Sequence, residues 1–349
     1  MPSPKIPIAN IYYLFCYAWD RFEQARAISA GAEDSPDLPN LLARVLHNGV
    51  HHLLRRGLDR GYQPKLEELE TVRSRISLND SLLLRAQRVQ RLVCEFDELS
   101  HDVLHNRIIK ATMLRLSRAA SLDKGLAHEL RATSRMLGDV TDIRMTAAVF
   151  GRVQLHRNNA YYDLLLRICR LAFDLMLPTP GGSGYQFQDV LRDERKMAGV
   201  FEAFVRNFYR AEQNIFRVES LQIRWNATPL TLDDTVQLPV MITDIFLTAP
   251  TRQIIIDTKY YAEAFQEGRF GSKSFHSGNL YQIFAYLVNA EAKGPNFLKT
   301  EGMLLYPTVG DKIAAHYEIA GHVLQLASIN LDQSWAAIAA DLKALTATK

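Results

Sequence analysis

Ile254-Ile255-Ile256-Asp257-Thr258-Lys259 has the pattern of a buried β-strand that ends in two charged side chains. It follows Val240-Met241-Ile242-Thr243-Asp244-Ile245, a second apolar run that contains a carboxylate. The polar segment between the two runs predicts a hairpin turn, which brings Asp244 beside Asp257. Asp257 and Lys259 are two residues apart, so they project from the same face of the strand.

Two carboxylates beside a lysine suit the hydrolysis of a phosphodiester. Hard cations such as Mg²⁺ bind carboxylate oxygens and water, and they leave coordination positions open for phosphate. A bound metal lowers the pKa of its water, and a nearby lysine can orient that water or, as the neutral amine, deprotonate it. We therefore expect Asp244 and Asp257 to hold Mg²⁺ and Lys259 to act beside it. The alternative is a strand that leaves the core with Asp257 and Lys259 solvated at its end.

A helix expected after this strand carries two further polar candidates. Leu280, Ile283 and Leu287 recur at helical spacing on one apolar face. Gln282 and Tyr286 are four residues apart and share another face of the same helix. The alternative is an ordinary amphipathic helix whose polar face contains a glutamine.

The order of these residues resembles the PD-(D/E)xK nuclease motif, with Asp257-x-Lys259 placed 13 positions after Asp244. Many nucleases of this class, including the RecB-like ones, carry a similar Q-x-x-x-Y on the helix after the catalytic strand. The resemblance implies that Gln282 contacts the scissile phosphate or a metal-bound water, with Tyr286 as a further candidate.

Two secondary candidates flank the motif. Nucleases of this class often place a glutamate on the helix before the sheet, and Glu202 lies on the helix expected over residues 197–212. Glu202 and Arg206 also have i, i+4 spacing, so a surface ion pair is the other interpretation. His276 lies in the polar loop before the Gln282 helix and is a candidate for a DNA contact or an ordinary loop residue.

Five segments elsewhere in the chain occur in a characteristic order. They are Ile6–Trp19, Phe96–Leu99, Asn106–Thr112, Phe275–Gln282 and Leu304–Pro307. In this order, and with the nuclease hairpin between them, they resemble the McrC family of McrBC 5-methylcytosine-dependent restriction systems, from Ile6 to about Trp335. One departure is at Val72–Ile76, where a glycine is expected before the Arg-Ile pair.

The resemblance implies a metal-dependent type IV restriction endonuclease that cuts methylated DNA. Its catalytic set would be Asp244, Asp257, Lys259 and Gln282, with Mg²⁺ held by the two aspartates. Such proteins associate with a GTP-hydrolysing AAA+ ring of the McrB type and stimulate its GTPase. The chain has no Gly-x-x-x-x-Gly-Lys-Ser/Thr phosphate loop, so nucleotide chemistry must come from that partner. A non-catalytic adaptor that activates an AAA+ ring is the alternative, and dimerisation for double-strand cleavage is left open.

The coarse pattern predicts an α/β fold with two domains. Residues 1–159 are expected to form a mostly helical, mixed domain that binds the partner, and residues 160–349 a PD-(D/E)xK endonuclease domain with a central mixed sheet flanked by helices. Further helices are expected over 10–22, 38–56, 84–100, 103–121, 128–136 and 160–177, and one from Ser334; a strand is expected over 303–306 and a hairpin over 316–330. On the 84–100 helix, Arg85, Arg88 and Arg91 could form a stripe. The composition of residues 178–184 predicts a loop.

Composition indicates an intracellular globular protein of 349 residues with 48% hydrophobic residues. The three cysteines are far apart in apolar segments, which favours reduced thiols over disulfides or zinc ligands. No stretch reaches the ~20 apolar residues of a membrane span, and charged residues follow the apolar N-terminal run too early for a secretory signal. We therefore expect a cytoplasmic protein.

The two halves of the chain differ in charge. Residues 1–160 contain 23 Lys/Arg and 18 Asp/Glu, a net charge of +5, whereas the remainder has 18 and 20, or −2.

Overall fold

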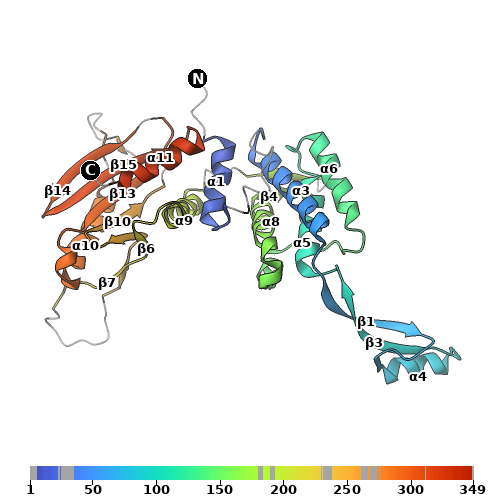
Figure 1. The fold of residues 1–349 in the computed structure, drawn as a ribbon. Helices are drawn as coiled ribbons and strands as arrows, with labels where there is room; N and C mark the ends of the chain where they lie inside the picture. The colour runs from blue at the N-terminus through green and yellow to red at the C-terminus, as the bar shows by residue number, and fades with distance from the viewer. Residues whose placement is uncertain are drawn as a thin grey trace. The chain divides into compact units, whose positions relative to one another are not determined.

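The computed structural model divides into two compact units (Figure 1). Unit 1 comprises residues 1–25 and 189–349, and unit 2 comprises residues 26–188. The structure describes residues 6–22, 24, 35–179, 184–188, 193–228, 230, 238–260, 266–267, 273–274, 276–310 and 312–347. Within these residues, no helix is long and apolar enough to cross a membrane.

The division between the units differs from the one expected at residues 159 and 160. The helix expected there is present as η1 (Arg157–Tyr162) and α8 (Asp163–Leu175), but it packs against α3 (Leu38–Arg56) in unit 2. The N-terminal helix α1 (Ile8–Ala18) belongs instead to unit 1, where it packs against α9 (Glu194–Glu212). An amphipathic helix joins the core that buries its apolar face, and sequence order alone does not identify that core.

Side-chain hydrogen bonds fix α1 on unit 1. Asn10 Nδ2 donates to the Leu331 carbonyl at 2.9 Å, which ties the start of α1 to the end of the sheet. The Tyr17 hydroxyl donates to a Glu212 carboxylate oxygen at 2.8 Å, and Asn207 Nδ2 donates to the Tyr17 carbonyl at 2.9 Å. Helix α1 is therefore a structural part of the unit that contains the predicted nuclease hairpin.

A six-stranded mixed sheet forms the centre of unit 1 (Figure 1). Its strand order is β14 (Ala314–Ile319), β15 (His322–Asn330), β13 (Glu301–Thr308), β10 (Arg252–Thr258), β9 (Ile245–Ala249) and β6 (Arg217–Glu219). The pairs β10–β13 and β13–β15 are parallel, and the other pairs are antiparallel. The hairpin predicted around the polar segment 248–253 is present as β9–β10, and the hairpin predicted over 316–330 is present as β14–β15. Helices α10 (Ser277–Ala290) and α11 (Trp335–Thr346) complete the unit together with α1 and α9, so the predicted α/β class with a central mixed sheet flanked by helices is confirmed.

Unit 1 also contains smaller elements. They are the strand pair β7 (Gln222–Ile223) and β8 (Met241–Ile242), the pair β11 (Gln266–Glu267) and β12 (Lys273–Ser274), and the short helices η3 (Glu291–Lys293) and η4 (Pro295–Phe297). The pair β7–β8 leads directly into the Asp244 hairpin, so its position affects the predicted site.

Helix α10 connects β10 to β13 and covers one face of the sheet. Its residues Ile283 and Leu287 are buried in a cluster with Ile255 and Leu304 of the sheet. Gly302 of β13 lies beneath this helix, and a Cβ atom there would lie 2.9 Å from Leu287 Cδ1 and 3.1 Å from Ile283 Cγ1. The missing side chain therefore allows α10, which carries Gln282, to pack closely on the sheet.

Replacing Gly302 with alanine should destabilise unit 1 by about 1–3 kcal/mol, because the added methyl group overpacks the interface with α10. Urea denaturation measures this loss. Gly199→Ala is the matched control: a Cβ atom at Gly199 would have nothing within 4 Å, and alanine favours its helix α9 by about 0.5–1 kcal/mol. A Gly302→Ala chain as stable as wild type would contradict the close packing.

Unit 2 contains a helical bundle, a short strand pair and an arm. The bundle contains α3, α5 (Leu104–Leu116), α6 (Lys124–Met136), α7 (Ala147–Gly151), η1 and α8, and the strand pair is β4 (Met176–Pro178) with β5 (Tyr185–Phe187). Helix α3 has the predicted bounds, with Asp37 as its N-cap accepting from the Asn40 backbone N–H at 2.9 Å. Of the loop expected over 178–184, residues 180–183 lie outside the described residues.

The arm of unit 2 corrects the helix predicted over 84–100. It contains β1 (Gly61–Leu69), β2 (Arg75–Ile76), α4 (Leu78–Ala86) and β3 (Leu92–Ser100). In β3, Cys94 and Phe96 are buried and alternate with exposed Glu95, which is the two-residue period of a strand. Arg88 has a φ of 64° and lies in the turn after α4, so the predicted stripe of Arg85, Arg88 and Arg91 does not form. The helix prediction was wrong because charged residues recur at helical spacing in this segment, whereas the segment forms a strand that is buried on one face only.

Asp102 stabilises the start of α5 next to the arm. Its carboxylate accepts from Arg107 Nε at 2.7 Å and Nη2 at 2.8 Å, and from the Thr141 backbone N–H at 2.7 Å. Burial alone would raise the pKa of Asp102, but these hydrogen bonds and the guanidinium charge hold it at about 2.

Asp102→Asn should therefore lower the free energy of unfolding by about 1 kcal/mol near neutral pH, a value reduced for the partial solvent exposure of the carboxylate. A depressed pKa gives stability that is fully present above the unfolded value of 3.8 and is lost as the pH falls toward 2. The difference between wild type and variant should thus shrink below about pH 4 in urea titrations. Asp97→Asn, at an exposed position of β3, is the control. A difference independent of pH would refute the assignment.

Candidate active site at the end of strand β10

The hairpin of β9 and β10 brings the two predicted aspartates together. Ile245 of β9 is paired with Ile256 of β10 across the hairpin. Asp244 is the residue before Ile245 and Asp257 is the residue after Ile256, so the two aspartates face each other. Asp257 is fully buried at 0% exposure, while Asp244 is half-buried. The interpretation that Asp257 is a solvated strand end is therefore wrong.

The surroundings of Asp257 are unusual for a carboxylate in a protein interior. Lys259 Nζ lies 2.8 Å from its Oδ2 atom and has a side chain that is itself 17% exposed. No backbone N–H or hydroxyl group of the described residues donates a hydrogen bond to either carboxylate oxygen of Asp257. Burial first, and then the negative charge of Asp244, raise its pKa to about 6 against the opposing effect of Lys259. A buried carboxylate of this kind lowers the free energy of unfolding unless a cation compensates its charge.

Asp244 is held by hydrogen bonds that the sequence analysis did not predict. Its Oδ2 atom accepts from the Thr258 backbone N–H at 2.9 Å and from the Thr258 hydroxyl at 3.0 Å. Its carbonyl accepts from Arg206 Nε at 3.1 Å and from the Ser220 hydroxyl at 3.2 Å. Asp244 thus has a fixed backbone and a fixed side chain, which is the preorganisation that a ligand-binding carboxylate needs.

A chain of hydrogen bonds positions Lys259 from helix α10. Lys259 Nζ donates to Gln282 Oε1 at 2.9 Å, and Gln282 Nε2 donates to the Tyr286 hydroxyl at 2.7 Å. The Tyr286 hydroxyl in turn donates to the Ile242 carbonyl at 3.2 Å. The structure therefore brings Gln282 and Tyr286 to the site, with Gln282 bound to the ammonium of Lys259.

The ion pair predicted for Glu202 is confirmed, and the charge of Glu202 also interacts with that of Asp244. Glu202 forms this ion pair with Arg206 in α9. Burial raises the pKa of Glu202, and the next largest cause is the negative charge of Asp244, whereas Arg206 and Lys259 lower it. Asp244, Asp257 and Glu202 thus affect one another electrostatically, and together they form the acidic cluster of unit 1. His276 directly precedes α10, but most of the loop over 261–275 lies outside the described residues.

The two aspartates offer the donor set of a hard cation. Within the part of the chain that the structure describes, no three His, Cys, Asp or Glu side chains group closely enough to hold a metal alone. Mg²⁺ does not need such a cage, because it is usually bound by one or two carboxylates and keeps several waters or phosphate oxygens. The Asp257 oxygens, which receive no hydrogen bond from a backbone N–H or hydroxyl group of the described residues, fit that role beside Asp244.

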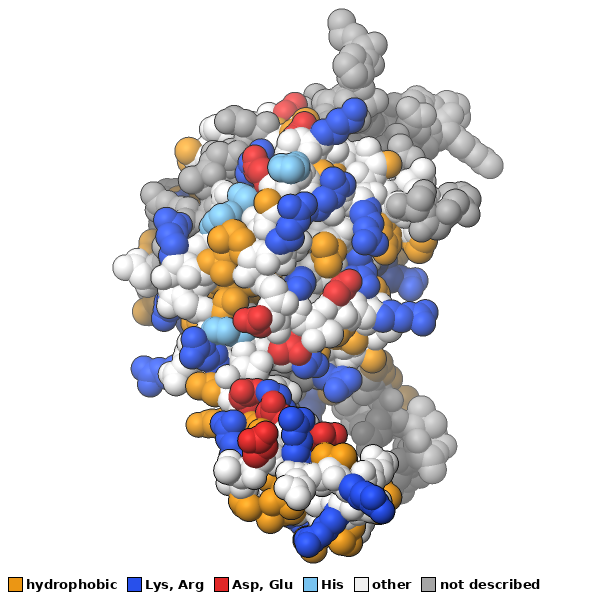
Figure 2. All heavy atoms as spheres, turned by 90° about the vertical axis from the view of Figure 1, so that its right-hand side faces the viewer, with side chains coloured by type: hydrophobic (Ala, Val, Ile, Leu, Met, Phe, Trp, Pro, Cys, Tyr) orange, Lys and Arg blue, Asp and Glu red, His pale blue; other side chains and the backbone are white. Residues whose placement is uncertain are grey.

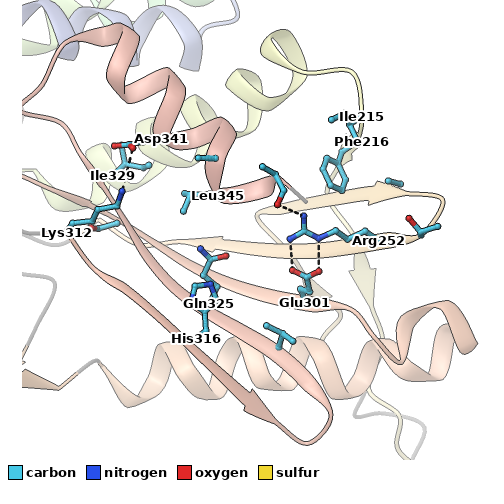
Figure 3. A pocket seen from close by; sticks show the side chains of 16 residues that line it. Ile215, Phe216, Arg252, Glu301, Lys312, His316, Gln325, Ile329, Asp341 and Leu345 are labelled. Atoms are coloured by element: carbon cyan, nitrogen blue, oxygen red, sulfur yellow. Dashed lines mark hydrogen bonds and ion pairs between the residues drawn. The ribbon is translucent and has the colours of Figure 1, made fainter. Parts of the chain in front are cut away.

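A cavity of about 630 Å³ lies elsewhere in unit 1, between the sheet and α11 (Figure 3). Its carboxylates are paired with cations: Glu301 with Arg252 at 2.7 Å, and Asp341 with Lys312 at 3.6 Å. Arg252 is five residues from Asp257 in β10, so the two side chains project from opposite faces of the strand. The cavity is therefore separate from the acidic cluster and offers no unpaired carboxylate to a metal.

Comparisons with known proteins identify the family of the chain. The family model of the McrBC 5-methylcytosine restriction system component matches residues 9–307. The chain is 31% identical over 342 residues to the type IV methyl-directed restriction enzyme EcoKMcrBC of Escherichia coli (strain K12), covering 98% of this chain and 97% of that protein.

Its fold is similar to that of a chain in the refined half-complex from the tetradecameric assembly of Thermococcus gammatolerans McrB AAA+ hexamers with bound McrC. The TM-score is 0.60 at 14% identity, and the match covers 97% of this chain and 75% of that chain. The resemblance to McrC inferred from the five ordered segments is confirmed, and the chain belongs to the McrBC 5-methylcytosine restriction system component family.

Proposed function

We propose that this chain is the Mg²⁺-dependent endonuclease subunit of a modification-dependent restriction complex and that it cuts phosphodiester bonds in methylated DNA. The observation that carries the proposal is the fully buried Asp257, which faces Asp244 and has Lys259 at 2.8 Å. A protein keeps such an arrangement at a cost in stability, and strained or undercompensated groups of this kind are typical of functional sites.

Each residue of the site has a distinct role in this proposal. Asp244 and Asp257 would hold Mg²⁺, which supplies charge stabilisation and a more acidic bound water when present. The Lys259 ammonium orients the attacking water and stabilises the negative charge that develops on the phosphate. Gln282 holds that ammonium in place through its 2.9 Å hydrogen bond, and Tyr286 fixes the orientation of the Gln282 amide. Glu202 adds a third negative charge close to the proposed metal position.

We infer that unit 2 is the part of the chain that binds an AAA+ GTPase ring of the McrB type. Unit 2 contains 23 Lys/Arg and 18 Asp/Glu, a net charge of +5, and Figure 2 shows many Lys and Arg side chains on the face that it presents. On its arm, Leu78, Leu82 and Leu83 of α4 are 71%, 64% and 62% exposed. Large apolar side chains at this exposure are typical of a surface that a partner covers. The Thermococcus gammatolerans assembly, in which McrC is bound to McrB hexamers, supports a ring as that partner.

A cleavage assay with a simultaneous GTPase measurement tests this proposal. The full chain is mixed with its McrB-type partner, GTP, Mg²⁺ and a plasmid that contains 5-methylcytosine. Wild type should cut, and Asp244→Ala should cut at least about 100-fold more slowly because metal binding is lost. Both proteins should stimulate GTP hydrolysis equally, because Asp244 lies in unit 1 and the proposed ring contact in unit 2.

The same assay separates the endonuclease from the alternative of a non-catalytic adaptor, which the exposed leucines of the arm would also suit. Stimulated GTP hydrolysis without any scission by wild type, with either Mg²⁺ or Mn²⁺, would establish the adaptor. Cleavage by Asp244→Ala at the wild-type rate would show that the reaction takes place elsewhere.

A further inference from the structure

A polar hollow of about 380 Å³ lies in unit 1 between the β7–β8 pair and the C-terminal end of α10. In Figure 1, β7 lies beside α10, and the two elements are in contact. The side chains that give the hollow its chemistry are Gln222, Arg224, Trp225, Asn226, Asn289 and Lys293. They comprise two cations, one indole and three amides, and none of the described residues that line the hollow is a carboxylate.

Hydrogen bonds within the hollow hold its parts in place. Trp225 Nε1 donates to the Pro239 carbonyl at 2.9 Å, which fixes the indole while 41% of the residue stays exposed. The Asn226 backbone N–H donates to Asn289 Oδ1 at 2.8 Å, and Asn289 Nδ2 donates to the Ala285 carbonyl at 2.8 Å. The hollow is thus built by three segments, 222–226, 239–240 and 289–293, and hydrogen bonds join them.

The two cations of the hollow are available to a ligand. Arg224 and Lys293 are both exposed, and neither forms an ion pair with a carboxylate in the described part of the chain. Arginine and lysine bind phosphate oxygens, side-chain amides bind phosphate and sugar, and an indole face stacks on a base or a sugar. This combination of groups is suited to a nucleic-acid strand.

The hollow is placed to meet a strand that is bound at the acidic cluster. Strand β8 ends at Ile242, two residues before Asp244. On α10, Asn289 follows Gln282 by seven residues, which corresponds to about 10 Å along the helix axis. A DNA strand rises about 3.4 Å per nucleotide, so this distance is roughly three nucleotides.

We propose that this hollow binds the DNA strand about three nucleotides from the scissile phosphate, with Arg224 and Lys293 on phosphates and Trp225 against a sugar or base. The inference rests on the proposed endonuclease function, because it places the scissile phosphate at Asp244 and Asp257. It assigns substrate binding to residues that take no part in the acidic cluster.

Binding of a fluorescent 20-base-pair duplex by the full chain tests the proposal directly. Asp257→Asn is present in every protein, so that no cutting occurs. Arg224→Ala/Lys293→Ala should weaken binding at least about tenfold near 0.1 M salt and lower the slope of log affinity against log salt by about 2. Trp225→Ala should weaken binding by about fivefold or more without changing that slope, since stacking is not ionic. Arg210→Ala, at an exposed arginine of α9, is the matched control and should bind like the parent.

The result that overturns the inference is a double variant that binds the duplex with the affinity and salt slope of Arg210→Ala. A parent chain that binds no duplex at low salt would overturn it as well.

A cleavage assay of the complex, with Asp257 intact, separates this inference from the proposed function. If the complex cuts and the double variant leaves KM unchanged, the inference fails and the function stands. If no protein cuts but duplex binding still depends on Arg224 and Lys293, the function fails and the nucleic-acid site stands. A raised KM with an unchanged kcat in the double variant is the result expected when both are right.

Discussion

Asp257→Asn should abolish cleavage of methylated DNA and, at the same time, make the chain more stable in a buffer that contains EDTA. The amide removes the negative charge that the proposed metal needs, and we expect the rate to fall by at least about 1,000-fold. Without metal, wild type keeps a fully buried carboxylate that no backbone N–H or hydroxyl group of the described residues stabilises. Its removal should raise the free energy of unfolding by about 1–3 kcal/mol.

Single-turnover cleavage and thermal denaturation measure the two effects. In a unit of this length, each kcal/mol gained in the free energy of unfolding raises Tm by roughly 2–4 °C. Asp332→Asn, which changes an exposed aspartate of unit 1, is the matched control and should alter neither quantity. If Asp257→Asn unfolded at a lower temperature, the carboxylate would be a structural group, and its loss of activity would carry no information about catalysis.

Lys259→Met should also stop cleavage, but its effect on stability should have the opposite sign. The ammonium lies 2.8 Å from Asp257 Oδ2, and its loss leaves that buried charge without its cation. We expect a rate at least about 100-fold lower and a loss of about 2 kcal/mol in the free energy of unfolding. Methionine keeps most of the aliphatic stem, so the packing of the side chain changes little.

A double-mutant cycle checks this explanation. The variant Asp257→Asn/Lys259→Met has neither charge, and it should be more stable than the sum of the two single effects predicts, while remaining inactive. Lys299→Met, at an exposed lysine, is the control for the substitution itself. Stability effects that simply add in the double variant would show that the two side chains do not interact.

The local parts of the candidate site could be predicted from sequence because short-range patterns encode them. Three isoleucines followed by Asp257 identify a buried strand, and the turn before them determines the β9–β10 hairpin. The i, i+4 spacing of Gln282 and Tyr286 placed both on one face of α10, and their hydrogen bond confirms it. Each of these features depends on residues that are close together in the chain.

The parts that escaped prediction depend on distant contacts. Arg206 holds the Asp244 carbonyl from 38 residues away, and the Glu202 ion pair predicted for it explains only part of its contacts. Helix α1 joins unit 1 through Asn10 and Tyr17, although residues 26–188 separate it from the rest of that unit. Strand β3 was missed because it is buried on one face only, so that its apolar signal is weak.

Anomalous diffraction from Mn²⁺ in crystals of the full chain, with Asp257→Asn crystals as the reference, tests the central claim most directly. Mn²⁺ takes the same oxygen ligands as Mg²⁺ and can be located by its anomalous signal. We expect one peak at about 2.1 Å from a carboxylate oxygen of both Asp244 and Asp257, and no peak there in the variant. A saturating Mn²⁺ soak that leaves both aspartates ordered and the position between them without a peak would contradict the claim that they hold the metal.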